Sequence, residues 1–149
     1  MDPLRPGAVV AEIPGSSLGA EPGAVVFYKV TCPTCQVAAP PMERLFRAVG
    51  DRFAAVVQDP ADRAAEFARA YDTSFPSIPD EEPYEVSKAW GVRVVPTLFV
   101  TADGHVEDVV ESWDREGWAR AAARLGELLG SPVPPPSEEG DGLPSFRPG

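Results

Sequence analysis

Short apolar runs of strand length alternate along the chain with longer stretches in which apolar residues recur at helical spacing. The run AVVFYKV at 24–30 is almost continuously apolar and rich in β-branched and aromatic residues, which is typical of a central strand buried on both faces. Residues 53–57 and 97–101 have the same character. Residues 106–111 alternate apolar and acidic side chains, as an edge strand does, and 8–12 form a possible short strand.

Helical spacing predicts helices over 33–49, 61–71, 84–90 and 114–129. Pro40 and Pro41 should kink the first of these, because proline removes a backbone donor and clashes with the preceding turn. Residues 72–83 are expected to form a loop, and Asp103-Gly104 a hairpin turn. Strands joined by helices and followed by an antiparallel hairpin predict an α/β fold, with a mixed sheet flanked by helices on both faces.

Proline divides the chain into a folded core and two flanking segments. Proline makes up 18 of 149 residues, about 12% where about 5% is usual. Four prolines lie in residues 1–22, which we interpret as an N-terminal extension, and six lie in 131–149. The sequence SPVPPPSEEGDGLPSFRPG offers few groups that could build a core, so we expect a Pro-rich disordered tail after a single domain at 23–130.

Charge and hydropathy exclude several functional classes. The formal net charge is −10, which disfavours binding to nucleic acid or to an anionic membrane surface. No apolar run approaches the roughly 20 residues that span a bilayer. The first residues, MDPLRPG, lack a basic segment followed by an apolar one, so a cytoplasmic location is expected. We also expect a monomer.

Both cysteines belong to one motif, Cys32-Pro33-Thr34-Cys35, between the most apolar strand and the first helix. A thiol at a helix N-terminus faces free backbone N–H groups and the positive end of the helix dipole, which favour the thiolate that attacks disulfides. Cys32 is therefore the expected nucleophile, and Cys35, one turn further in, the resolving thiol. Two structural free thiols are the alternative. With His105 expected to be solvated, the ligands are too few for structural zinc, and neither a metal nor an organic cofactor is expected.

A second motif, Val95-Pro96-Thr97, places a proline directly before a core strand, where it removes a ladder hydrogen bond. Together with the CPTC motif, with Pro40 five residues after Cys35, and with the stretch SFPSIPDEEPYEVSKAWGVRVVPTLFVTADGHV, it resembles the thioredoxin-like superfamily. Within it, the chain is most similar to the redoxin branch of cytochrome-maturation thioredoxins and peroxiredoxin-like proteins. The resemblance covers about residues 22–130 and implies a thioredoxin fold.

The resemblance also implies roles for individual residues. Cys32 would attack and Cys35 resolve, while Pro96 would be a cis-proline that shapes a groove where a substrate strand pairs with the Val95 backbone. The remaining groove residues would be Thr31, Pro33 and Thr34. Supporting residues would be Tyr28, where the family usually has tryptophan, Lys29, which is a candidate for charge stabilisation of Cys32, and Pro40 in the active-site helix.

The chain departs from the resembling families at several positions. Val26 and Ala38 stand where thioredoxins and cytochrome-maturation relatives, respectively, carry an acid near the resolving thiol. The Gly-Gly glutathione site of glutaredoxins is absent after Thr97, since 98–100 continues as strand. Neither cysteine has, three residues before it, the threonine that orients peroxide in peroxiredoxins, since Lys29 and Cys32 occupy those two positions.

The sequence therefore predicts a thiol–disulfide oxidoreductase. Its substrates would be protein or small-molecule disulfides, and an external thiol reductase would return the electrons. A non-catalytic thioredoxin-fold binding module and a peroxiredoxin-like thiol peroxidase remain the alternatives.

Overall fold

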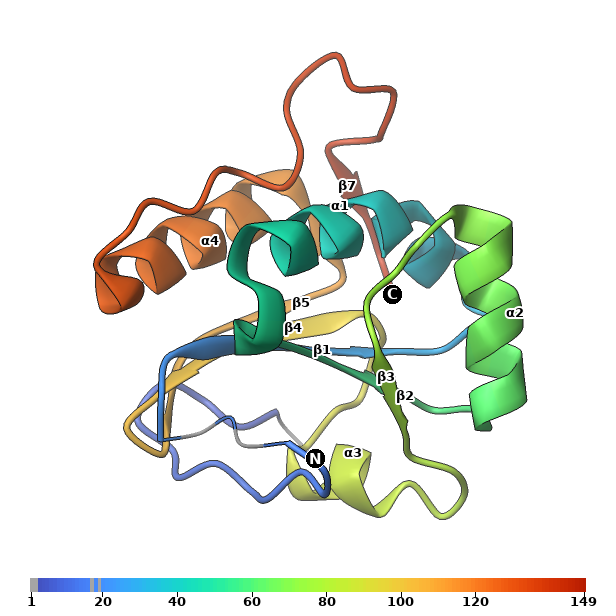
Figure 1. Cartoon of the computed structure of the whole chain (residues 1–149), viewed down its shortest axis with the longest axis horizontal. Coiled ribbons are helices and arrows are strands. Elements are labelled where there is room, and N and C mark those ends of the chain that lie inside the picture. Colours follow the sequence, from blue (N-terminus) through green and yellow to red (C-terminus); the bar gives the residue numbers. More distant parts are fainter. Residues whose placement is uncertain (1–2, 17, 19) are drawn as a thin grey trace.

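A mixed five-stranded sheet forms the centre of the molecule in the computed structural model, which describes residues 3–16, 18 and 20–149 (Figure 1). The strands lie in the order β3-β2-β1-β4-β5. Strand β1 is central, parallel to β2 and antiparallel to β4, and β4 forms the predicted hairpin with β5. The expected α/β class is confirmed. The bounds are β1 (Gly23–Tyr28), β2 (Phe53–Val57), β3 (Ser77–Pro79), β4 (Thr97–Ala102) and β5 (His105–Glu111).

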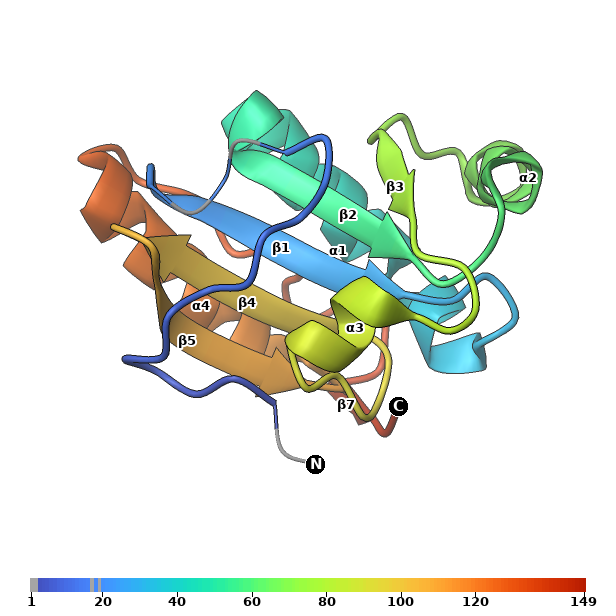
Figure 2. The same cartoon turned by 90° about the horizontal axis from the view of Figure 1, so that it is seen from below.

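Helices cover the sheet on both faces. Helices α1 (Pro33–Val49) and α4 (Arg115–Leu129) lie over one face, and α2 (Ala61–Tyr71) lies beyond β3. The short α3 (Glu85–Ala89) lies on the opposite face with residues 3–16 of the N-terminal extension (Figure 2). Every residue of β1 is buried. Because side chains alternate along a strand, Val26 and Tyr28 join the core beneath α1, whereas Val25 and Phe27 join a second core beneath α3.

Most predicted elements are found within one or two residues of their expected bounds. Helices over 33–49 and 61–71 and the strand over 53–57 are confirmed as predicted. Strand β3 was not anticipated: it lies in the segment expected to be loop, and it pairs in parallel with β2. At the N-terminus the possible strand over 8–12 amounts to one isolated bridge between Val9 and His105. None of the helices in the described part of the chain is long and apolar enough to cross a bilayer.

The main difference from the sequence-based expectation concerns residues 131–149, which we call the C-terminal segment. Disorder was expected, but the structure places this segment across α4 and α1 and then back to the sheet (Figure 1). Val133 and Ser137 are buried, and strand β7 (Phe146–Arg147) pairs antiparallel with β6 (Trp113–Asp114). The abundant prolines favour this, because a fixed φ leaves less conformational entropy to lose on ordering.

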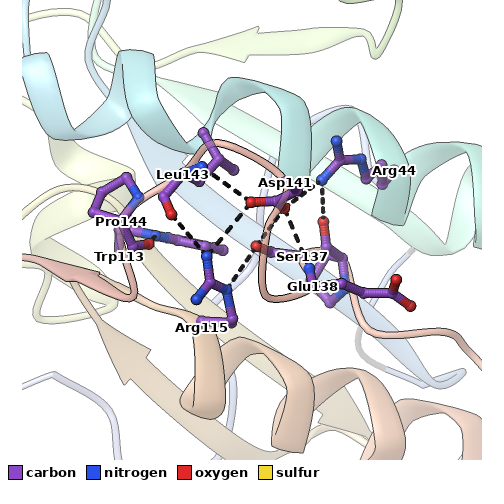
Figure 3. A network of polar contacts seen from close by, with 9 residues as sticks. Arg44, Trp113, Arg115, Ser137, Glu138, Asp141, Leu143 and Pro144 are labelled. Atoms are coloured by element: carbon purple, nitrogen blue, oxygen red, sulfur yellow. Dashed lines mark hydrogen bonds and ion pairs between the residues drawn. The ribbon is translucent and has the colours of Figure 1, made fainter.

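A polar network holds the turn of the C-terminal segment (Figure 3). The Asp141 carboxylate accepts hydrogen bonds from the Ser137 hydroxyl (2.7 Å) and from the backbone N–H groups of Glu138 (3.2 Å) and Leu143 (3.0 Å). It also pairs with Arg44 of α1 (3.2 Å) and Arg115 of α4 (3.4 Å). One carboxylate thus joins the segment to both helices that cover the sheet.

Candidate active site

The CPTC motif lies where β1 leads into α1. Strand β1 ends at Tyr28, and Cys32 is the N-cap residue of α1 with an extended backbone (φ −81°, ψ 118°). Pro33 opens the helix, where its missing N–H costs no helical hydrogen bond. Both cysteines are free thiols; Cys32 is half-buried and Cys35 fully buried. One sulfur can therefore meet a substrate while the other stays beneath it.

The two thiols have opposite acidities. A hydrogen bond from the Cys35 thiol, helped by the backbone N–H groups of Cys35 and Thr34, lowers the pKa of Cys32 to about 6, although burial opposes the shift. Burial raises the pKa of Cys35 far above its usual range, and the hydrogen bond to Cys32 raises it further. At neutral pH the pair thus consists of a thiolate at Cys32 and a thiol at Cys35.

The turn before β4 lies against the first sulfur. Cys32 Sγ is 3.5 Å from the carbonyl oxygen of Val95, and Val95 is half-buried. The Val95–Pro96 peptide bond is cis, as is Glu82–Pro83. Two hydrogen bonds fix this turn: the Thr97 hydroxyl donates to the Val94 carbonyl (2.7 Å), and the Ser112 N–H donates to the Pro96 carbonyl (2.8 Å).

The remaining expected groove residues differ in accessibility. Thr31 and Pro33 are exposed beside Cys32, but Thr34 is buried. Its hydroxyl donates to the Pro148 carbonyl (2.5 Å) and accepts from Arg147 Nε (3.1 Å). The structure therefore brings Thr34 together with the C-terminal segment, which was not expected to be part of the site.

The three expected supporting residues lie around the motif in different ways. Tyr28 is a core residue whose hydroxyl pairs with Ser77 (2.6 Å), and burial raises its pKa to about 12. The Lys29 ammonium lies over the Tyr84 ring, 5.6 Å from its centroid, while the Lys29 backbone N–H donates to Cys35 Sγ (3.5 Å). Pro40 lies further along α1. Of these, Lys29 contacts the cysteine pair through its backbone.

Two charged residues near the cysteines were missed from the sequence. Asp59 follows β2, and its carboxylate accepts from the Val30 N–H (2.9 Å), next to the Lys29 N–H that bonds Cys35; its charge adds to the raised pKa of Cys35. Adjacent parallel strands end at the same sheet edge, so the position of Asp59 after β2 was an available signal. Arg147 adds a positive charge that lowers the pKa of Cys32. No local pattern pointed to it.

No protein-family model matches the chain, and no curated protein sequence matches it. Solved structures do match. A candidate protein disulfide isomerase from Bacteroides thetaiotaomicron has a TM-score of 0.73 and 16% identity, over 88% of this chain and 96% of that one. A thiol:disulfide interchange protein of the thioredoxin family from Chlorobium tepidum has a TM-score of 0.59 and 22% identity, over 87% and 97%. The chain has a thioredoxin fold.

A third matching structure belongs to a secreted protein. A secreted disulfide oxidoreductase of Mycobacterium tuberculosis, described as homologous to E. coli DsbE, has a TM-score of 0.53 and 21% identity, over 63% of this chain and 71% of that one. Within the thioredoxin fold of our chain, the CPTC motif lies at the first strand-to-helix junction and the Val95–Pro96 bond at the start of β4. These two segments meet at Cys32.

Proposed function

We propose that the chain is a thiol–disulfide oxidoreductase that uses Cys32 as nucleophile and Cys35 as resolving thiol. The observation that carries this proposal is the pairing of a half-buried thiol of pKa about 6 with a buried thiol of raised pKa, one helical turn apart. A thiolate is the attacking species in disulfide exchange, and a protonated partner cannot compete for the substrate.

The reaction has two displacement steps. The Cys32 thiolate attacks one sulfur of a substrate disulfide, forms a mixed disulfide and releases the other sulfur as a thiolate. Cys35 then loses its proton and attacks Cys32 Sγ, which releases the second substrate thiolate. The substrate gains two electrons and the pair becomes a disulfide. An external thiol reductase reverses the oxidation by the same two steps.

The second step needs a proton acceptor, and we assign this role to Asp59. Thioredoxin-like chains often carry an acid for this purpose at positions that are Val26 and Ala38 here. The Asp59 carboxylate and the Cys35 sulfur are bound to the N–H groups of consecutive residues, Val30 and Lys29. A carboxylate held there is positioned to take the thiol proton as Cys35 attacks.

Partners and compartment follow from this chemistry. We propose disulfide substrates, an external thiol reductase, and a monomer. In the cytoplasm, the location expected from the sequence, glutathione and thioredoxin keep thiols reduced, so the protein would reduce the disulfides of its substrates there. The secreted M. tuberculosis protein has the same fold, so the reduction potential is the property that separates a reductant from an oxidant.

A redox titration of the Cys32–Cys35 pair in defined thiol buffers, read by alkylation and intact mass, tests the proposal. We expect one reversible two-electron transition between about −180 and −290 mV, the range of working oxidoreductases. Cys35→Ser should trap mixed disulfides with substrates, and Cys32→Ser should not. A pair that never oxidises, or one that stays oxidised to below about −300 mV, would contradict catalysis and favour a binding module.

A further inference from the structure

Residues 147–149 lie on the surface between the CPTC motif and the Val95–Pro96 turn. Pro148 accepts the hydrogen bond of the Thr34 hydroxyl at 2.5 Å, and the Gly149 N–H donates to the Ser112 hydroxyl at 3.0 Å. A Cβ placed on Gly149 would lie 3.0 Å from the carbonyl carbon of Val95, so the glycine backbone packs directly on that peptide group. The same Val95 carbonyl is 3.5 Å from Cys32 Sγ.

The chain reaches this position because β7 is held along its length. Residues Trp113 and Asp114 pair with Arg147 and Phe146, and the Arg115 N–H donates to the Ser145 carbonyl (2.9 Å). One residue earlier in the chain, the Pro144 carbonyl accepts a hydrogen bond from the indole N–H of Trp113 (2.7 Å). The Asp141 network lies earlier still, at the turn of the C-terminal segment (Figure 3). Residues 146–149 are therefore positioned by the fold, although their side chains are exposed.

We propose that residues 146–149 set the substrate class of this site by covering the Val95 backbone. With these residues in place, the protein reduces low-molecular-weight disulfides and excludes extended polypeptides. This inference rests on the proposed oxidoreductase function. It concerns which disulfides reach Cys32, a question that the chemistry of the cysteine pair leaves open.

The physical argument concerns what each substrate must contact. A polypeptide bound by strand addition gains its affinity from main-chain hydrogen bonds, and here those bonds would be made with the peptide groups of Val95. Gly149 already packs on that backbone, so a polypeptide must first displace residues 148–149 and break their hydrogen bonds to Thr34 and Ser112. A small disulfide needs only an approach to the half-buried Cys32 sulfur.

Two probes with the same leaving group separate these requirements. One is the mixed disulfide of cysteine with thionitrobenzoate, and the other is the same mixed disulfide made at the central cysteine of a short extended peptide. In each, the Cys32 thiolate attacks the probe cysteine sulfur and expels coloured thionitrobenzoate. Cys35 then loses a proton, closes the Cys32–Cys35 disulfide and releases the probe thiol. The rate of colour release from prereduced protein gives the first step alone.

The variant that carries the test ends at Ser145, which keeps the Asp141 network and Pro144. We expect the ratio of the peptide-probe rate to the cysteine-probe rate to rise about ten-fold or more relative to the full chain. A ten-fold change corresponds to about 1.4 kcal/mol, the free energy that the peptide no longer spends on displacing residues 146–149. Loss of Arg147 also removes a positive charge near Cys32. That change acts on both probes alike, so the ratio is unaffected by it.

A point variant gives the same answer without shortening the chain. Gly149→Val cannot keep its contact with Val95, because the added Cβ would overlap the carbonyl group, so its ratio should rise as well. Ser145→Val adds the same side chain at an exposed position of the C-terminal segment and should leave the ratio as in the full chain. Unchanged ratios in both test variants would overturn the inference. Failure of the full chain to react with either probe would instead overturn the proposed function.

Discussion

Thr34 and Pro148 are 114 positions apart in the sequence, yet the hydroxyl of the first donates a 2.5 Å hydrogen bond to the carbonyl of the second. Thr34 lies between the two cysteines, in the first turn of α1. The hydrogen bond therefore connects the C-terminal segment to the same helical turn that sets the acidity of Cys32. A substitution at Thr34 should loosen the C-terminal segment, and removal of Pro148 should change the first turn of α1.

The reactivity of Cys32 should depend on pH. Because the pKa of Cys32 is lowered to about 6, its alkylation by iodoacetamide should level off above pH 7 or so and fall as pH drops through 6. The same shift links to stability: the free energy of unfolding of the dithiol form should rise between about pH 6 and the unfolded pKa near 8.5, and be lost as pH falls through the folded value.

Cys35→Ala provides the matching test, since the hydrogen bond from the Cys35 thiol is the main cause of the shift. The alkylation midpoint should move towards the ordinary cysteine value near 8.5. A midpoint that stays near 6 would show that the backbone N–H groups and Arg147 hold the thiolate without Cys35.

Asp59→Asn should slow the closure of the Cys32–Cys35 disulfide. We expect a decrease of about a hundred-fold, the lower end of what a positioned base contributes, measured by acid quenching of the mixed disulfide and intact mass. Asp62→Asn, at an exposed position in the first turn of α2, is the control and should leave the rate as it was. A faster closure would indicate that the Asp59 charge acts only by raising the pKa of Cys35.

Asp141→Asn should loosen the C-terminal segment. It removes the charge that pairs with Arg44 and Arg115, so amide exchange at residues 146–149 should accelerate, whereas the exposed Glu139→Gln should change little. The hydrogen bond from Ser137, with that from the Leu143 N–H, holds the pKa of Asp141 well below its usual range. Its contribution to stability should therefore persist down to about pH 4 and decline in more acidic solution.

Gly126→Ala tests the crossing of the C-terminal segment over α4. Alanine inside a helix usually stabilises by about 1 kcal/mol relative to glycine. Here the added Cβ would lie 2.9 Å from the Val133 nitrogen and 3.1 Å from the Ser131 carbonyl oxygen. Overpacking should lower the free energy of unfolding by about 1–3 kcal/mol in urea denaturation. Ala123→Gly on the exposed side of α4 calibrates helix propensity, and a gain in stability for Gly126→Ala would refute the close crossing.

The sequence was informative wherever local pattern and burial agree. β1 is buried on both faces and reads as an unbroken apolar run, and the amphipathic stripe of α4 ends at Gly130 with φ +73°. The strand β3 was not recognisable, because its three residues, Ser-Ile-Pro, are too few to show alternation. It exists as a strand because β2 offers a free parallel edge.

The cysteine pair was located from the sequence alone, but its surroundings were not. Asp59 lies just after β2, so parallel pairing of the first two strands would have indicated its position near the cysteines. The position of Arg147, by contrast, depends on a contact between segments far apart in the chain, about which local composition carries no information. In the same way, a proline-rich stretch predicts weak local structure but does not show whether partners such as Arg44, Trp113 and Arg115 will hold it.

The position of Gly149 on the Val95 peptide group affects where a label or tag can be attached to this protein. A purification tag, a fluorophore or a fused domain attached after Gly149 would begin beside the Val95 carbonyl, which is 3.5 Å from Cys32 Sγ, so we expect it to disturb the exchange reaction. Labels are better placed at exposed positions of α2, such as Arg63 or Glu66, in the helix that lies beyond β3.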